Sequence, residues 1–305
     1  MKISYILIAL LVFYGCNDST TKEANNASPL SKFKIAFVSD RDGNSEIYTM
    51  HADGTKLKNV SQHDSLDFNP TWSKVAEKLF FYSKRDGNAE LYTVNPSGSE
   101  LKRLTNHPAT DVLPELSPNG KTLVFMSDRD SLGKNVYTMD LNGSNLKPLT
   151  KNQFYEESPS WSPSGKDIIF TRQLRDSADT SHAANGEIFI MEANGSALRR
   201  LTHKPGYDSG AKFSPDAKQI AFYGLNMESE TWDIFIMNAD GSDLTNLTND
   251  TIECYSPDWS PDGQWLVYTA GSSGNYNLFA INVKTKQRIQ LTDTDGRNES
   301  PVFME

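Results

Sequence analysis

Residues 256–292 read SPDWSPDGQWLVYTAGSSGNYNLFAINVKTKQRIQLT, and this stretch decides the fold. A short segment ending at Trp259 runs into a Ser-Pro-Asp-Gly turn, where Pro and Gly supply the dihedral angles that a tight turn needs. The apolar run 265–269 is typical of a buried strand, and 277–283 alternates with a period of two. A last segment ends at Leu291. Four short strands joined by tight turns predict one blade of a β-propeller.

The same pattern occurs six times along the chain. One marker, an aromatic residue or Leu followed by Ser, occurs at Trp72-Ser73, Leu116-Ser117, Trp161-Ser162, Phe213-Ser214, Trp259-Ser260 and, without the Ser, at Phe303. A second marker occurs at Val60-Ser61, Leu104-Thr105, Leu149-Thr150, Leu201-Thr202, Leu247-Thr248 and Leu291-Thr292. Both markers advance by the same steps, and a repeat of about 40–45 residues is typical of a propeller blade.

The two ends of the chain belong to the same blade. Residues 34–39 match the second strand of the repeat, and residues 299–303 match the first strand. We therefore expect the C-terminal strand to join the N-terminal blade and close the ring, which removes the free edge of an open stack of sheets. The predicted fold is all-β, a six-bladed β-propeller with four-stranded blades over residues 34–305.

The first 33 residues form a separate region. Residues 1–15 carry one charge, Lys2, and an apolar core that is too short to span a membrane, so they predict a secretory signal peptide. The Gly15-Cys16 pair that ends it is similar to the lipobox of bacterial lipoproteins and implies lipidation of Cys16; an ordinary signal peptide with an incidental Cys is the alternative. Residues 16–33 are then expected to be a lipid-anchored flexible tether, because they are polar and lack periodicity.

Charge and composition limit the partners and the chemistry. The formal net charge of −9 argues against nucleic acid and against an anionic membrane surface, so membrane contact is expected only through the lipid anchor. The sequence holds no Gly-x-Ser-x-Gly elbow, and no pair among its five His has zinc-ligand spacing. No catalytic residue can be named, and the question of an enzyme stays open. If Cys16 is lipidated, Cys254 is left unpaired, and we expect it to be a buried packing residue.

Four stretches resemble the repeats of TolB-type six-bladed propellers. They are WSPSGKDIIF (161–170), FSPDAKQIAF (213–222), SDRDGNSEIYTM (39–50) and MNADGSDLTNLT (237–248). The resemblance covers residues 34–305 and implies a protein of the bacterial periplasm that presents its faces and channel to other envelope proteins. The N-terminal α/β domain of that family is expected to be absent, because the tether leaves no room for it. We therefore expect a monomeric periplasmic or outer-membrane-associated lipoprotein that needs no cofactor.

Acidic residues gather just before the first marker, where the chain crosses from one blade to the next at the mouth of the channel. The expected binding residues are Asp67, Asp111, Glu156, Glu157, Asp208 and Glu299. Together they predict a negative funnel that attracts an envelope protein with a basic element. Several alternatives stay open: carboxylates that cap backbone N–H groups, Ca²⁺ in the channel, a small molecule or glycan at its mouth, or a carbohydrate-active enzyme.

Two further features concern the same end of the channel. Asp-Arg-Asp at 40–42 and 128–130 predicts ion pairs between blades. The longest step of the repeat places an insertion at 172–186, on the same face as the acidic crossovers. A long loop on a rigid scaffold is typical of recognition, and a neutral insertion is the alternative.

Overall fold

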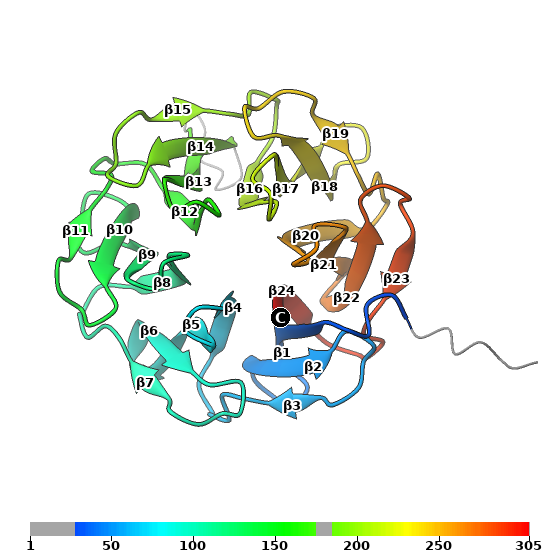
Figure 1. The fold of residues 1–305 in the computed structure, drawn as a ribbon, viewed down its shortest axis with the longest axis horizontal. Coiled ribbons are helices and arrows are strands. Elements are labelled where there is room, and N and C mark those ends of the chain that lie inside the picture. Colours follow the sequence, from blue (N-terminus) through cyan, green and yellow to red (C-terminus); the bar gives the residue numbers. More distant parts are fainter. Residues whose placement is uncertain (1–27, 175–184, 305) are drawn as a thin grey trace, which may run out of the picture.

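The computed structural model describes residues 28–174 and 185–304, and every regular element within them is a β-strand. Six four-stranded antiparallel sheets stand as blades around a central channel (Figure 1). In five blades, the strands from the channel outward are β4–β7 (Asp67–Ser73, Lys78–Asp86, Asn88–Val94, Lys102–Arg103), β8–β11 (Asp111–Leu116, Thr122–Ser127, Asn135–Asp140, Lys147–Pro148), β12–β15 (Glu156–Trp161, Asp167–Gln173, Gly186–Glu192, Arg199–Arg200), β16–β19 (Asp208–Phe213, Gln219–Asn226, Thr231–Asn238, Thr245–Asn246) and β20–β23 (Glu253–Trp259, Trp265–Ser272, Asn275–Asn282, Arg288–Gln290).

The remaining blade is built from both ends of the chain. It consists of β24 (Asn298–Met304), β1 (Lys34–Ser39), β2 (Glu46–His51) and β3 (Lys58–Asn59), in that order. β24 runs antiparallel to β1, with Ile35 opposite Phe303. The predicted six-bladed propeller and its closure by the C-terminal strand are both confirmed.

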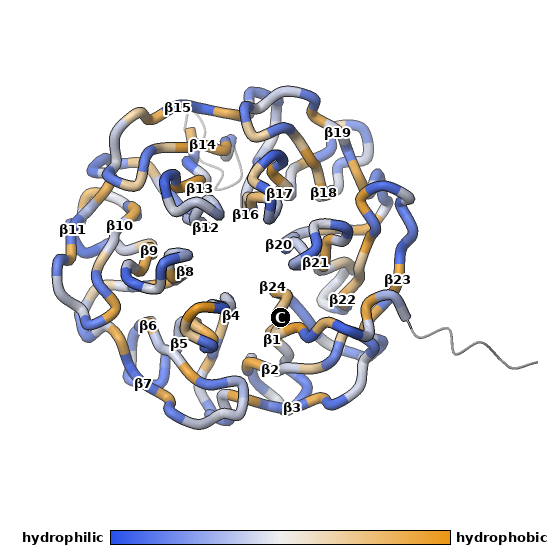
Figure 2. Tube along the Cα trace, in the orientation of Figure 1, coloured by the Kyte–Doolittle hydropathy of each residue, from blue (hydrophilic) through white to orange (hydrophobic). Residues whose placement is uncertain are grey.

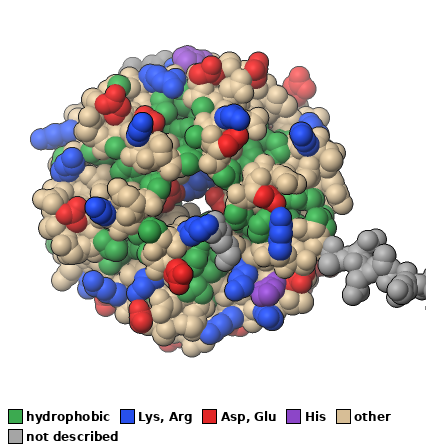
Figure 3. All heavy atoms as spheres, in the orientation of Figure 1, with side chains coloured by type: hydrophobic (Ala, Val, Ile, Leu, Met, Phe, Trp, Pro, Cys, Tyr) green, Lys and Arg blue, Asp and Glu red, His purple; other side chains and the backbone are tan. Residues whose placement is uncertain are grey.

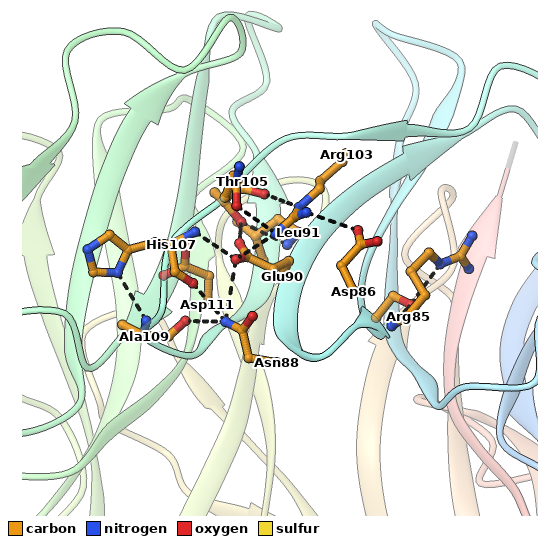
Figure 4. A network of polar contacts seen from close by, with 12 residues as sticks. Arg85, Asp86, Asn88, Glu90, Leu91, Arg103, Thr105, His107, Ala109 and Asp111 are labelled. Carbon is orange, nitrogen blue, oxygen red and sulfur yellow. Dashed lines mark hydrogen bonds and ion pairs between the residues drawn. The ribbon is translucent and has the colours of Figure 1, made fainter.

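The second marker of the repeat ties each blade together at its outer edge. In the blade of β4–β7, Thr105 Oγ1 accepts a hydrogen bond from Leu91 N at 3.0 Å and donates one to Glu90 (Figure 4). Glu90 also accepts from His107 N at 2.7 Å, in the segment that leaves for the next blade. Glu46 with Ser61 and Asp233 with Thr248 repeat this arrangement. The hydroxyl of each marker thus fixes where the chain crosses over.

The core is repeated as well. One large side chain at the centre of each second strand is fully buried: Phe37, Phe81, Phe125, Phe170, Phe222 and Tyr268. Figure 2 shows hydrophobic segments along the strands and hydrophilic ones in many connections at the perimeter. Burying aromatic side chains supplies a large share of the stabilisation of such a core.

Each innermost strand contains a bulge beside the channel. The register with the second strand shifts there, and one residue takes a positive φ: Asn69, Leu113, Ser158, Gly210, Ser256 and Ser300. A bulge bends the strand and changes the direction of the side chains around it. Charged residues that follow the bulge, such as Glu115 and Lys212, line the channel as a result.

The structure corrects the last part of the expected tether. Leu30 is fully buried and Phe33 nearly so, and both pack in a core cluster with Phe303. Phe33 O also accepts a hydrogen bond from Ala52 N at 2.9 Å. Residues 28–33 therefore belong to the folded domain, because two apolar side chains gain more from burial than a polar linker would. Residues 16–27 lie outside the described residues.

The strands alternate in direction, so the propeller has two distinct faces. We define the turn face by the first-to-second-strand turns and third-to-fourth-strand hairpins, each with its flanking strand residues: 73–78, 116–122, 161–167, 213–219, 259–265, 51–58, 94–102, 140–147, 192–199, 238–245 and 282–288, together with Lys34 and Met304. We define the loop face by the crossovers and second-to-third-strand loops: 39–46, 86–88, 127–135, 173–174, 185–186, 226–231, 272–275, 59–67, 103–111, 148–156, 200–208, 246–253 and 290–298.

Candidate functional site

Four of the expected binding carboxylates are completely buried, at the point where each innermost strand begins. Each lies against a basic side chain: Asp67 with Arg85, Asp111 with Arg129, Glu156 with Arg172 and Asp208 with Lys204. The Asp67–Arg85 pair is 2.8 Å long, and the side chain of Arg85 is itself nearly buried. In such a buried ion pair the two charges neutralise each other inside the blade, so the carboxylate is not presented to a partner.

The strand register explains the three pairs with arginine, whereas Lys204 pairs with Asp208 from the crossover segment just before it. Asp67 stands opposite Ser83 on the second strand of its own blade, and Arg85 follows two residues later. Arg85 folds back over Ser83 and stacks on Tyr92, with its guanidinium carbon 5.0 Å from the ring centroid. In the Asp-Arg-Asp sequences, Arg129 pairs with Asp111 of its own blade, and Arg41 donates a hydrogen bond to Asn298 of its own blade. These contacts within one blade correct the expectation of ion pairs between blades.

The other two expected carboxylates bind tyrosine hydroxyls. Glu157 accepts hydrogen bonds from Tyr207 and, at 2.7 Å, from Ser209. Glu299 accepts from Tyr255 and, at 2.7 Å, from Arg297. Burial, followed by the nearby carboxylate, raises the pKa of Tyr207 and of Tyr255 above the ordinary value, so both hydroxyls remain donors at neutral pH.

The expected negative funnel is corrected by these contacts. Only Glu157 of the six carboxylates lines the central cavity, which encloses about 1120 Å³. Lys84 and Lys134 line it as well, and four of the other carboxylates are buried with cations beside them. The physical reason is that a buried carboxylate without a partner is costly, so the fold supplies a cation for each.

Sequence reasoning missed a charged cluster in the middle of the channel. Lys212 forms an ion pair with Glu115, although their strands belong to different blades. Glu115 Oε1 also accepts from Trp161 N, and Asp258 Oδ2 accepts from Phe303 N, each at 2.8 Å. The signal was available, because all three charged residues directly precede the first marker.

Burial sets the protonation of this cluster. It raises the pKa of Asp258 to about 6, against the opposing effect of Lys212. Burial alone lowers the pKa of Lys212, but Glu115 and Asp258 together raise it above its ordinary value. Lys212 is therefore charged at neutral pH and holds the strands around the channel together.

An arc of aromatic residues runs through two neighbouring blades, and one of its members, Tyr223, lines the central cavity. Tyr207, Trp232, Tyr223, Tyr255 and Tyr276 follow one another edge to face, with neighbouring ring centroids 5.5–6.3 Å apart. Tyr276 also donates to Glu253 at 2.6 Å. The arc combines flat apolar surfaces with hydrogen-bonding groups, as binding surfaces often do.

The two faces carry different charge. By position in the sequence, the loop face holds seventeen Asp and Glu against eight Lys and Arg, with 175–184 not counted. The turn face holds fourteen Lys and Arg against ten Asp and Glu. The net charge of −9 is thus unevenly distributed, and the acidic character expected around the channel belongs to the loop face as a whole.

Several other expected features can be located. Cys254 is fully buried, and burial raises the pKa of its thiol to about 12. Among residues 28–174 and 185–304, no three His, Cys, Asp or Glu side chains are arranged to hold a metal ion. The same residues form no helix with the length and hydrophobicity that a membrane crossing requires. Cys16 and most of the 172–186 insertion lie outside the described residues.

Comparisons with known proteins agree with the geometry. The Tol-Pal system protein TolB of Francisella tularensis is 33% identical over 48 residues, which are 16% of this chain and 11% of that protein. TolB from Acinetobacter baumannii superimposes with a TM-score of 0.76 at 22% identity, covering 90% of this chain and 67% of that one. An oligogalacturonate lyase from Vibrio parahaemolyticus superimposes with a TM-score of 0.55 at 13% identity, covering 85% and 74%.

The matched segment spans only about a tenth of the curated TolB relatives, and the likeness to the solved structures is one of fold. A family model, in contrast, matches almost the whole chain, at residues 17–180 and 177–305. That model describes the TolB β-propeller domain, and this chain belongs to that family.

Proposed function

We propose that this chain is a lipid-anchored protein of the bacterial cell envelope that acts as a protein-interaction scaffold, with its partner bound on the loop face. The observation that carries the proposal is the charge difference between the faces, because a field of one sign on one face orients and attracts a partner of the opposite sign. The partner should therefore present a basic element.

The channel mouth supplies the specific contacts in this proposal. Glu157 is partly exposed and lines the cavity, and Tyr223 and Lys84 line it too. Glu299 is buried behind Tyr255 and orients that ring. Asp67, Asp111, Glu156 and Asp208 hold the crossover segments in place through their ion pairs, and they support the binding surface without touching the partner.

The family and the N-terminal sequence support the location that we propose. Relatives that carry the TolB name are designated components of the Tol-Pal system. By that likeness we place this propeller in the periplasm, as a monomer held to a membrane by a lipid on Cys16. The proposal requires no cofactor.

The test compares two pairs of substitutions that remove the same charge from opposite faces. Glu228→Gln with Asp293→Asn changes exposed loop-face residues, and Glu77→Gln with Asp167→Asn changes the turn face. Proteins that bind the wild-type chain are recovered from the envelope and identified, and the affinity of the purified partner is measured at rising salt. The loop-face pair should weaken binding and reduce its dependence on salt. Equal affinities of the two variants would contradict the proposal.

A second candidate function is binding of a glycan at the channel mouth, and the aromatic arc favours it. In this function the aromatic faces would pack against sugar rings, and Glu253 and Glu157, which accept hydrogen bonds from Tyr276 and Ser209, would accept from sugar hydroxyls as well. Titration with neutral and acidic oligosaccharides, read by tryptophan fluorescence, would separate the two functions. Saturable binding that is lost in Trp232→Ala would support glycan binding. No response to any sugar would favour the protein-interaction function.

A further inference from the structure

We propose that the turn face docks on an anionic lipid surface, so that the loop face points away from the membrane. The inference rests on the proposed function for the anchor, but its observations concern the folded domain. The net charge of −9 does not reveal a basic face, because it sums the charges of two faces of opposite sign. The turn face alone has a surplus of four basic residues. Basic residues close to an anionic bilayer are attracted to its surface potential, and their contributions add.

The distribution of these basic residues suits a flat surface. Lys121, Lys147 and Lys166 are exposed in two neighbouring blades, and Lys286 is exposed in another. Figure 3 shows this face, with Lys and Arg side chains spread around the rim among Asp and Glu, and with both hydrophobic and charged side chains near the central opening. A ring of this kind brings several cations to one plane at once.

Exposed leucines recur on the same face. Five hairpins carry a Leu at the equivalent position, and each is between 43% and 45% exposed: Leu57, Leu101, Leu146, Leu198 and Leu244. Leu146 lines a groove with Trp161 between two blades. Apolar side chains beside lysines are the combination that interfacial membrane proteins use, because the chains enter the headgroup region while the cations contact phosphates.

The chain also enters the propeller from this side. Lys32 forms an ion pair of 2.8 Å with Asp262, which lies in a turn of the turn face, and Phe33 leads directly into β1. Residues 17–27 can span at most about 40 Å when fully extended. A lipid on Cys16 would therefore hold the propeller close to the bilayer through a segment that enters beside the turn face.

Chemical modification of lysines on the full chain tests this arrangement. The purified protein, as the cell processes it, is mixed at low salt with vesicles of phosphatidylglycerol and phosphatidylcholine, or of phosphatidylcholine alone. Acetylation is then read at Lys121, Lys147 and Lys166 on the turn face, at Lys151 on the loop face, and at Lys84, which lies on β5 two residues before the loop face and lines the central cavity. We expect a several-fold loss of acetylation at the turn-face lysines on the anionic vesicles only, and no change at Lys84 and Lys151. Equal protection of both faces, or protection of the loop face, would overturn the proposal.

Matched variants show whether charge is responsible. Lys121→Glu with Lys166→Glu should abolish the protection of Lys147, whereas Lys84→Glu with Lys151→Glu makes the same change in net charge and should preserve it. Protection of Lys147 that persists in the first variant would contradict the proposal. Protection of the turn-face lysines by envelope proteins but not by vesicles would contradict it as well. The mass of the N-terminal peptide in the same sample reports whether Cys16 carries a lipid. The lipid anchor of the proposed function is therefore tested separately from the docking of the turn face. Equal melting temperatures establish that each variant is folded.

Discussion

Phe33 and Phe303 pack edge to face with ring centroids 5.4 Å apart, and they join the entry segment of the propeller to its last strand. Both rings are buried in one cluster with Trp265 of the neighbouring blade. The contact makes ring closure depend on the two ends of the chain at once.

Phe303→Ala should therefore destabilise the whole domain by about 3–5 kcal/mol, the usual cost of removing a buried aromatic ring. Phe154→Ala is the matched control, because Phe154 is 39% exposed and its loss should cost under about 1 kcal/mol. Urea unfolding followed by circular dichroism measures both. Equal midpoints for the two variants would show that the ring does not depend on this closure.

The buried ion pair of Asp67 and Arg85 yields a second prediction. Arg85→Met should cost about 3–5 kcal/mol in unfolding free energy, because it leaves a fully buried carboxylate without its cation. Adding Asp67→Asn to that variant should restore part of the loss. Lys78→Met breaks the exposed pair with Glu100 and should cost under about 1 kcal/mol. A double variant as unstable as Arg85→Met would contradict this account of the carboxylate layer.

Asp208 predicts a dependence of stability on pH. Burial raises its pKa to about 7, although Lys204 Nζ lies 2.6 Å from the carboxylate. The folded chain then holds this proton more tightly than the unfolded chain, so the stabilisation is complete below about pH 4 and is lost as pH rises through about 7. Relative to Asp208→Asn, the wild type should lose stability between pH 5 and pH 8. Urea unfolding at both pH values tests this, with exposed Asp216→Asn as control; a constant difference would show that the pKa is not raised.

The N-terminal sequence predicts lipid on Cys16. Metabolic labelling with a fatty-acid analogue should mark the wild type and leave Cys16→Ser unmarked. Cys254 should not contribute, because it is buried and its pKa of about 12 keeps the thiol protonated. Equal labelling of the two chains, or no labelling of either, would contradict the prediction of a lipid on Cys16.

The fold was predictable because its markers act locally. The Ser of the first marker accepts a hydrogen bond within its own turn, as Ser260 does from Trp265 N at 2.9 Å, and the Thr of the second closes a clamp on its own blade. These hydrogen bonds recur wherever the local sequence recurs, so the periodicity of the sequence was enough to predict the blades.

The site was harder to predict because its partners come from other strands. Asp67 and Arg85 were both visible in the sequence, but only the strand register places them together and cancels their charge. Glu115, Lys212 and Asp258 all directly precede the first marker, but the other blades have Thr71, Ser160 and Val302 there, so the repeat marks the position without predicting its charge. Leu30 and Phe33 are two apolar residues in a polar segment, and their burial depends on the neighbouring blade.

The central claim is that the two faces meet different surroundings, a protein on the loop face and lipid on the turn face. Met227 on the loop face and Val75 on the turn face are 58% and 57% exposed, so photo-crosslinking residues placed at these positions have equal access. Irradiation of living cells should give protein adducts from position 227 and lipid adducts from position 75. The same adducts from both positions, or lipid at 227 and protein at 75, would contradict the account.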